Sequence, residues 1–171
     1  RSPLSPRNKI IIAIVGVLLV LFVGFNKFAH SYASAESTLK RFHKAAMEED
    51  KKALGKLVEF EGGIKLSSGE LEAIINYAKH SLNDYTKSVG LSEDESEQLL
   101  YTVQQTGKVF GLFDGHKINV RQQYVSAPLP VEGIEYRLNE ENFKVTEADG
   151  RVIIGPIAPG IYELKADYNG E

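Results

Sequence analysis

Cysteine is absent from the 171 residues of this chain. Its absence excludes disulfide bonds and thiolate zinc sites within the sequence. Acidic residues are missing from residues 1–35, which carry four basic ones, whereas residues 36–171 hold 16 lysines and arginines against 23 aspartates and glutamates. Because a region with this acidic excess has no basic field to attract nucleic acid, we expect no nucleic-acid partner.

A long apolar run stands near the N-terminus. Residues 10–25 carry no polar side chain, and the run extends to Ala29 with Asn26 and Lys27 close to its end. A helix over 10–29 is about 30 Å long at about 1.5 Å per residue, which matches the apolar core of a bilayer. Lys27 can reach the interface with its long side chain. The sequence therefore predicts a transmembrane helix at 10–29.

A cleavable signal peptide is the alternative to a retained anchor. Arg7 and Lys9 suit its basic N-terminal region, and Ala33-Ser34-Ala35 matches a small-residue cleavage site. The apolar run, however, is longer than the usual span of about 7–15 residues, and the cleavage motif lies well beyond its end. We therefore expect a retained helix, and whether the site is cleaved stays open.

The charges beside the run predict its orientation. Arg1, Arg7 and Lys9 precede it, against Lys27 alone near its other end. Positively charged flanks stay in the cytoplasm. We therefore expect residues 1–9 to be a cytoplasmic linker from a domain upstream, and the body that follows the helix to be extracellular.

Helical signals dominate residues 34–106, which we predict to form an extracellular helical domain. Asp50 is a suitable N-cap for a short helix that ends near residues 62–63. Ser67 and Glu70 form a capping box for the next helix. Apolar residues then recur at helical spacing along one face: Leu71, Ile74, Ile75, Ala78, Leu82 and Tyr85.

A further helix is predicted to begin at Ser92 and to end at Gly107. Ser92 and Glu95 form a second capping box. The apolar side of this helix is supplied by Leu99, Leu100 and Val103. The acidic cluster at 92–97 is interpreted as a solvated first turn, favoured by the helix dipole, rather than as a cation site.

Strand signals replace helical ones after Gly107. In residues 107–127, extended runs flank Asp114-Gly115. An Asp-Gly pair between such runs is a strong two-residue turn signal. We therefore predict a β-hairpin connection over 107–127 with its turn at Asp114-Gly115.

Residues 128–171 carry short strand patterns separated by turns. Asp149-Gly150 predicts a tight hairpin, and Pro159-Gly160 a stiff turn before a final strand, because proline presets φ and glycine accepts positive φ. We predict a small β module here. The expected fold is α+β, with a single N-terminal transmembrane helix, a small helical domain and then a small antiparallel β-sandwich-like module.

Signals for catalysis or metal binding are weak. Ser37 and Lys40 match the S-x-x-K motif of penicillin-binding serine enzymes, but its companion motifs are missing and the chain is short for that fold. His80 and Asp84, four residues apart, are expected to share a helix face, but two ligands do not make a zinc site. His116 follows a glycine and is expected to face solvent. We therefore expect no catalytic residue, no cofactor and no metal site.

Four tyrosines lie in the β half, at Tyr124, Tyr136, Tyr162 and Tyr168. A row of exposed tyrosines can stack on sugar rings, which makes a glycan-binding surface one interpretation. Core and edge packing is the simpler interpretation, and we expect it for most of them.

The order of these parts resembles a known family. The matching stretches are LKRFHKAAMEEDKKALGKLV at 39–58, INYAK at 75–79, the hairpin through FDG at 113–115, and IGPIAPGIYELKA at 154–166. Together with the linker and span that precede them, they resemble the TcaA and YvbJ family of teicoplanin-resistance-associated membrane proteins of Gram-positive bacteria. The resemblance covers nearly all of residues 9–168.

This resemblance implies a cell-surface protein with a cytoplasmic zinc ribbon upstream, one membrane span and several small extracellular domains. It implies a link to the cell envelope and to glycopeptide susceptibility, and no catalytic centre. The present sequence lacks the cysteine-bearing ribbon and any further C-terminal domain, which truncation would explain.

Two classes of function fit these expectations. The first is a non-enzymatic, membrane-anchored envelope protein whose extracellular domains bind a wall polymer or other envelope proteins. The second is an extracytoplasmic sensor that couples an outer ligand to a cytoplasmic domain through the span.

Overall fold

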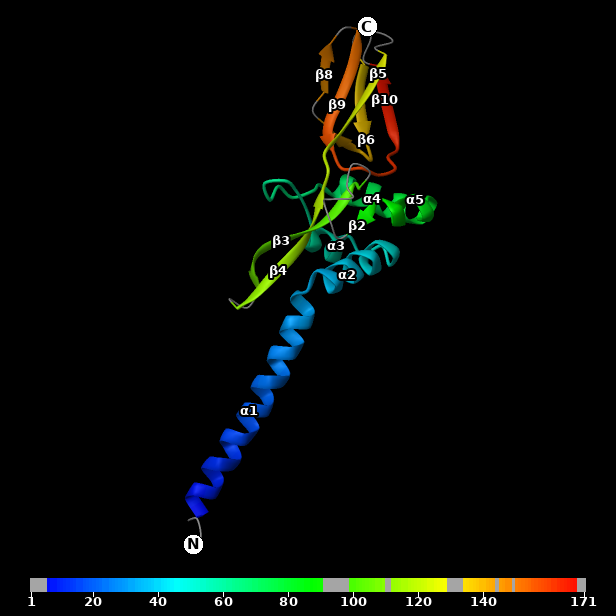
Figure 1. Ribbon diagram of the computed structural model, residues 1–171. Helices are drawn as coiled ribbons and strands as arrows, with labels where there is room; N and C mark the ends of the chain where they lie inside the picture. The colour runs from blue at the N-terminus through cyan, green and yellow to red at the C-terminus, as the bar shows by residue number, and fades with distance from the viewer. Residues whose placement is uncertain are drawn as a thin grey trace.

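The computed structural model describes residues 6–90, 99–109, 112–128, 134–143, 145–148 and 150–168 (Figure 1). A long N-terminal helix leads into a compact mixed module, and small sheets lie farthest from that helix. The helices are α1 (Pro6–Ala33), α2 (Ala35–Met47), α3 (Lys51–Leu57), α4 (Ser68–His80) and α5 (Leu82–Lys87). The α+β fold predicted from the sequence is confirmed.

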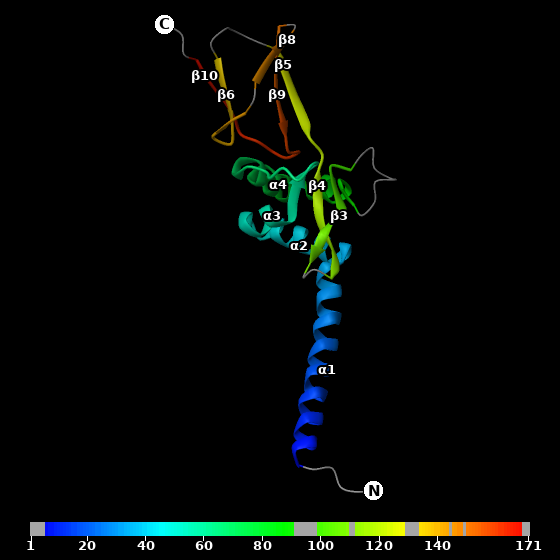
Figure 2. The ribbon, with the colours of Figure 1, turned by 90° about the vertical axis from the view of Figure 1, so that its left-hand side faces the viewer.

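A four-stranded sheet forms the centre of what we call the proximal module, residues 35–90 and 99–120. Its strands, in the order β1-β4-β3-β2, are β1 (Val58–Phe60), β4 (Phe113–Val120), β3 (Tyr101–Val109) and β2 (Val89–Gly90). β3 and β4 pair antiparallel, whereas β1 runs parallel to β4 and β2 parallel to β3. Helices α2, α3 and α4 lie on one side of this sheet (Figure 2).

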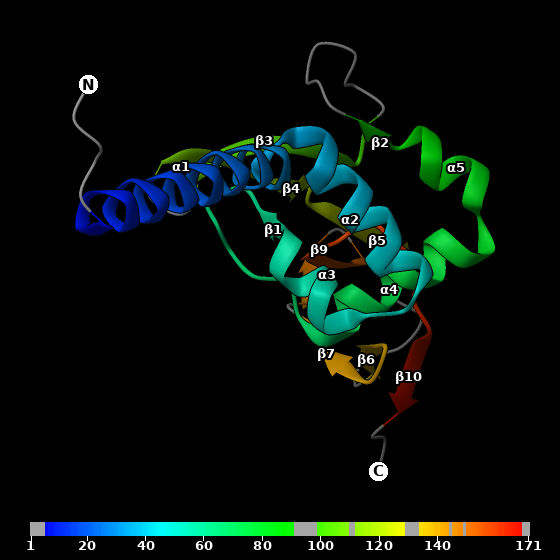
Figure 3. The ribbon, with the colours of Figure 1, turned by 90° about the horizontal axis from the view of Figure 1, so that it is seen from below.

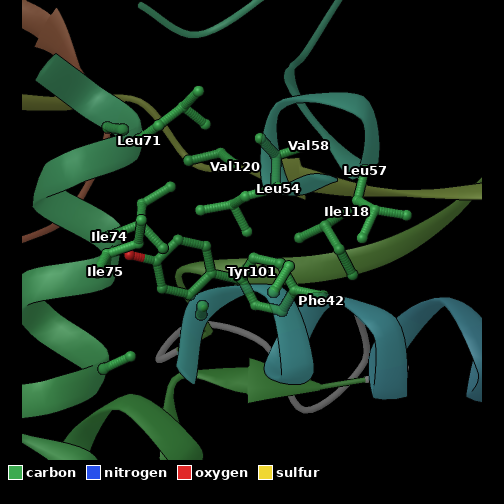
Figure 4. Packing of buried hydrophobic residues seen from close by; sticks show 14 of the residues in the cluster. Phe42, Leu54, Leu57, Val58, Leu71, Ile74, Ile75, Tyr101, Ile118 and Val120 are labelled. Carbon is green, nitrogen blue, oxygen red and sulfur yellow. The ribbon is translucent and has the colours of Figure 1, made fainter. Parts of the chain in front are cut away.

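The core of the proximal module lies between these helices and the sheet (Figure 4). Phe42 of α2, Ile74 of α4 and Tyr101 of β3 are fully buried. The ring centroids of Phe42, Tyr85 and Tyr101 lie 5.6–6.0 Å from one another. Ile75 is also buried, which confirms the predicted inward face of α4.

The predicted helix starts are confirmed at two caps. Asp50 Oδ1 accepts a hydrogen bond from the Ala53 amide at 2.9 Å and so caps α3. Ser67 Oγ accepts from the Glu70 amide at 3.2 Å, and Glu70 Oε2 accepts from the Ser67 amide at 2.7 Å. These bonds satisfy amides that have no partner within the helix.

Some helices end differently from the prediction. α3 ends at Leu57, because the chain then enters β1 and pairs with β4; residues 62–63 form a later turn. The predicted continuous helix through Tyr85 breaks at Ser81, which has φ −135° and ψ 49°. Serine favours helix ends over helix interiors. Leu82 is consequently exposed, while Tyr85 remains buried.

The prediction of a helix from Ser92 to Gly107 is wrong for the residues that the structure describes, 99–107. Residues 91–98, which include the second capping box and the acidic cluster, lie outside the described residues. Residues 101–109 form β3, with Val103 paired opposite Ile118 of β4. A short apolar run fits both helical and strand periods, and here the pairing with β4 decides between them.

The β3–β4 hairpin exists, but the prediction of its turn at Asp114-Gly115 is wrong. Both residues lie inside β4, where Asp114 pairs with Lys108 and Gly115 with Thr106. The register shifts between Thr106 and Lys108, which marks a bulge. A Cβ on Gly115 would lie 2.9 Å from the Thr106 carbonyl oxygen. Gly115 therefore permits close approach at the bulge rather than a turn.

The distal module, residues 123–168, consists of two three-stranded antiparallel sheets, β10-β6-β7 and β5-β9-β8. Their strands are β5 (Gln123–Pro128), β6 (Ile134–Leu138), β7 (Glu141–Asn142), β8 (Val145–Ala148), β9 (Arg151–Ile157) and β10 (Leu164–Tyr168). A small buried cluster is formed by Leu138, Val152, Ile154 and Ile157. Ala148 pairs with Arg151, and Gly150 has φ +69°, which agrees with a hairpin here; Asp149 of the predicted turn lies outside the described residues. The sandwich-like expectation is confirmed.

The segment 158–163 joins the two modules through hydrogen bonds. The Tyr101 hydroxyl donates to the Pro159 carbonyl at 2.6 Å. The Ala158 amide donates to Glu70 Oε1 at 3.1 Å, so the Glu70 carboxylate serves both the helix cap and the distal module. Pro159 and its neighbours therefore belong to a packed junction.

The same junction explains the start of the last strand. The Ile161 amide donates to the Ala73 carbonyl at 3.0 Å. The strand predicted from Ile161 therefore begins only at Leu164. Glu141 of β7 also accepts a hydrogen bond from the Gly69 amide at 2.8 Å. A carboxylate is favoured at the N-terminus of α4 by the helix dipole.

Candidate functional site

The pleat of β3 and β4 gives the four-stranded sheet two different faces. Tyr101 pairs with Val120 and Val103 with Ile118 on the face that packs against the helices. The side chains that alternate with these are polar and belong to the outer face. They are Thr102, Gln104 and Asn119.

A groove of about 500 Å³ follows this outer face to the point where β4 leads into β5. We call it the polar groove. Its polar and aromatic lining consists of Glu61, Thr102, Gln104, Asn119, Arg121, Gln122 and Tyr124. Hydroxyl, amide, guanidinium and phenol groups thus gather in one concave place.

The geometry of the polar groove suits a hydroxyl-rich ligand. The Asn119 side-chain amide donates to Gln104 Oε1 at 2.8 Å, which fixes the orientation of both amides. Tyr124 is 62% exposed and presents its ring at the end of the groove. Oriented amides exchange hydrogen bonds with hydroxyl groups, and an exposed aromatic ring can stack on the apolar face of a sugar.

A larger groove of about 760 Å³ lies between the C-terminal end of α1, helices α2 and α3, and the β3–β4 hairpin. We call it the basic groove. Its charged lining consists of Arg41, Lys44, Lys56, Lys108 and Lys117, against Glu48 and Asp50. This concentration of positive charge contrasts with the acidic excess of residues 36–171.

Ser37 and Lys40 both lie at the start of α2. The Ser37 amide donates to Ser34 Oγ at 3.2 Å, which caps the helix. Lys40 Nζ pairs with Glu36 at 2.6 Å and lowers the pKa of that carboxyl below its usual value. Both contacts stabilise the first turns of α2.

Two expectations about histidines are wrong. His80 ends α4 and Asp84 lies in α5, so the break between these helices removes their common face. The His80 ring contacts the Asn76 carbonyl instead, at 2.9 Å from Nδ1. His116 is half-buried rather than solvent-facing, with Nδ1 2.7 Å from the Ala33 carbonyl oxygen. This contact ties β4 to the end of α1.

The other histidines pack against aromatic rings. His43 meets the Tyr85 ring edge-on at 5.4 Å between centroids, and burial lowers the pKa of His43. The Tyr85 hydroxyl is buried without a hydrogen-bond partner among the described residues. His30 of α1 meets Phe113 of β4 edge-on at 6.3 Å.

The tyrosines of the β half divide between packing and exposure. Tyr136 and Tyr162 pack against the buried cluster of the distal module, and the Tyr162 hydroxyl donates to the Ala158 carbonyl at 2.6 Å. The packing interpretation is confirmed for this pair. Tyr168 lies in β10. Tyr124, by contrast, lines the polar groove.

Sequence reasoning missed both grooves, because their residues come together only through strand register and helix packing. The one available signal was the polar alternation at Thr102 and Gln104, which the helical prediction that ended at Gly107 concealed. Within the part of the chain that the structure describes, no three His, Asp or Glu side chains are placed to hold a metal ion. Comparison with protein-family models, with curated proteins and with solved structures found no match.

Proposed function

We propose that this protein is a non-enzymatic, membrane-anchored component of the cell envelope whose extracellular body binds a wall polysaccharide. The observation that carries the proposal is the polar groove, with its oriented amides and exposed Tyr124. The resemblance to the TcaA and YvbJ family supports the same place in the envelope and a link to teicoplanin susceptibility.

The anchor in this proposal is α1. Residues 14–33 form one helix long and apolar enough to cross a membrane, and its side chains are mostly exposed. A helix of this kind loses exposed apolar surface when it enters a bilayer. The bias of basic residues toward its N-terminal side supports an extracellular body.

Cysteine labelling of intact cells tests this orientation. The chain has no cysteine of its own, so Ser2→Cys and Ser126→Cys can each be labelled alone. An impermeant maleimide added to Gram-positive cells is expected to label position 126 and not position 2. Labelling of position 2 alone would place the body in the cytoplasm and overturn this part of the proposal.

Sedimentation with purified cell walls tests the polysaccharide ligand. The full chain in detergent micelles is expected to bind the wall fraction. Tyr124→Ala should weaken binding about fivefold, because one ring stack contributes about 1 kcal/mol. Asn119→Ala should also weaken it, since it removes the partner that orients Gln104. Leu82→Ala, at an exposed site outside the groove, is the control.

The result also separates a polysaccharide from a protein partner. Walls stripped of covalently bound proteins should still bind the wild-type chain. Binding that disappears with those proteins would favour an envelope protein as the partner. Equal binding by wild type, Tyr124→Ala and Asn119→Ala would show that the polar groove is not the site.

A sensor is the second candidate, and the junction of α1 with the body favours it. The Arg41 guanidinium lies 4.0 Å from the Tyr32 ring centroid and donates to the Tyr32 carbonyl at 3.1 Å. With the contact of His116 to Ala33, these bonds fix the exit of α1 from the body. A fixed exit can pass a movement of the body to the span. A cytoplasmic kinase or anti-sigma domain upstream would favour this function over simple binding.

A further inference from the structure

The β3–β4 hairpin runs beside the C-terminal end of α1 (Figures 1 and 2). Phe113 of β4 lies edge-on to His30 of α1, and His116 contacts the Ala33 carbonyl. His30 immediately follows the apolar run that ends at Ala29. The end of the hairpin is therefore at the level where α1 would leave the bilayer core.

Three described side chains at this end of the hairpin are apolar, and the ion pair of Lys108 with Asp114 lies just behind them. Leu112 is 68% exposed, and Val109 and Phe113 are half-buried. At the same level of α1, the rings of Phe28 and Tyr32 are exposed and stack with centroids 6.0 Å apart. Aromatic residues collect at membrane interfaces, where their rings suit the headgroup region. Exposed apolar side chains of both the hairpin and α1 thus lie at the predicted membrane boundary.

The basic groove adjoins this apolar surface, since Tyr32 and Val109 line it together with the lysines and Arg41. Several of its charges are only weakly neutralised. Lys44 is 3.9 Å from Glu48, with both side chains largely exposed, and exposed pairs of this kind contribute little. Lys56 is exposed as well. Lys108 pairs with Asp114, and Lys117 with Glu59.

We propose that the end of the β3–β4 hairpin inserts into the membrane interface beside α1, and that the basic groove binds the phosphate groups of anionic lipids. The inference rests on α1 as a membrane anchor, which is part of the proposed function. Basic side chains next to an inserted apolar surface are the arrangement that binds anionic membranes.

A lipid surface explains both features, which a wall polymer does not. A soluble phosphate polymer could neutralise the lysines, but it would leave Leu112 of the hairpin exposed to water. The lipid interface covers these apolar side chains and supplies phosphate at the same depth. Together with the contacts of Arg41 and His116 to the end of α1, a second attachment point would hold the body in one orientation on the membrane.

Fluorescence in lipid nanodiscs tests the insertion, with the full chain and single labels. Leu112→Cys carrying an environment-sensitive nitrobenzoxadiazole label is expected to emit at shorter wavelength and to be quenched by lipids spin-labelled near the headgroup. The same label at Leu82→Cys is the control, because α5 lies on the far side of the module from α1 (Figure 3). Emission from position 112 equal to that from position 82 would overturn the insertion.

An increase in the negative charge of the lipid mixture tests the basic groove. Replacing phosphatidylcholine partly by phosphatidylglycerol should strengthen the quenching at position 112, and added salt should reverse the effect. Lys44→Gln with Lys56→Gln should remove most of this increase, because each lysine near an anionic surface is worth about fivefold in affinity at low salt. Lys40→Gln with Lys52→Gln is the matched control, on the same helices but outside the groove.

The outcomes distinguish failure of the hairpin insertion from failure of α1 as a membrane anchor. A label at Leu18→Cys on α1 should be quenched by lipids spin-labelled deep in the acyl chains. Quenching at position 18 without quenching at position 112 would retain the anchor and reject the hairpin. Absence of quenching at position 18 would reject the anchor in the proposed function. An equal response of groove and control lysine variants would reject phosphate binding by the groove.

Discussion

An aspartate in place of Ile75 is expected to lower the free energy of unfolding of the proximal module by about 3 kcal/mol. Ile75 is 4% exposed and belongs to the buried cluster that includes Phe42 and Tyr101 (Figure 4). The side chains around it are apolar, so a carboxylate there would be buried without a counter-ion. Either the charge stays and destabilises the core, or the carboxyl takes up a proton at a similar cost.

Denaturant unfolding of the full chain in detergent micelles measures this effect. The chain contains eight tyrosines and no tryptophan, so tyrosine fluorescence and circular dichroism report the transition. Ile64→Asp is the matched control, since Ile64 is 58% exposed. It should change stability by no more than about 0.5 kcal/mol. Equal midpoints for both variants would show that α4 does not bury Ile75.

Features whose interacting groups lie within a few residues of one another could be predicted from the sequence. The capping box at Ser67 and the N-cap at Asp50 each depend on a side chain and an amide three residues apart, so Asp50, Ser67 and Glu70 show their role in the sequence itself. The inward face of α4 follows from its apolar spacing in the same way. The hairpin at 149–150 likewise depends on the glycine and its immediate neighbours.

Signals that depend on a partner strand were misread. Leu99, Leu100 and Val103 have a spacing that fits a helix, and only pairing with β4 makes residues 101–106 a strand. Asp114-Gly115 has the composition of a turn, yet its position is set by the register with Thr106 and Lys108. Register is decided by which face is buried along the whole strand, and no short window contains that information.

Both candidate sites belong to this second class. The polar groove needs the alternation of β3 and β4 together with Tyr124 from β5. The basic groove needs helices α2 and α3 beside a hairpin that is far from them in sequence. Neither site has a short motif, because binding surfaces of this kind require residue types at positions in space rather than at fixed spacings.

The junction between the modules combines a local signal with a distant partner. Pro159-Gly160 was predicted as a stiff turn from its composition. The need for glycine, however, comes from α4: a Cβ on Gly160 would lie 2.6 Å from the Ala73 carbonyl carbon and 2.7 Å from its oxygen. Helix backbone cannot yield as a flexible side chain does. Gly160 therefore permits the close approach of segment 158–163 to α4.

Gly160→Val is accordingly expected to release the distal module from the proximal one while both stay folded. Segment 158–163 must withdraw from α4. This movement breaks the hydrogen bond from the Ile161 amide to the Ala73 carbonyl and strains the hydrogen bond from the Tyr101 hydroxyl to the Pro159 carbonyl. Overpacking of this kind costs about 1–3 kcal/mol. Each hydrogen bond across the junction contributes about 0.5–1.5 kcal/mol, so this cost removes a large part of what holds the two modules in place.

Pulsed electron paramagnetic resonance measures the release, with spin labels at Leu82→Cys on the proximal module and Ser126→Cys on the distal one. The wild-type background should give a narrow distance distribution, and Gly160→Val a broad one with faster hydrogen exchange at Ile161. Glu163→Val is the control, because the Glu163 side chain is exposed and only its backbone bonds to Asn139. A narrow distribution in Gly160→Val would mean that the backbone of α4 can shift to admit a side chain. The Glu70 and Glu141 carboxylates would then hold the two modules together, because each accepts a hydrogen bond from a backbone amide of the other module.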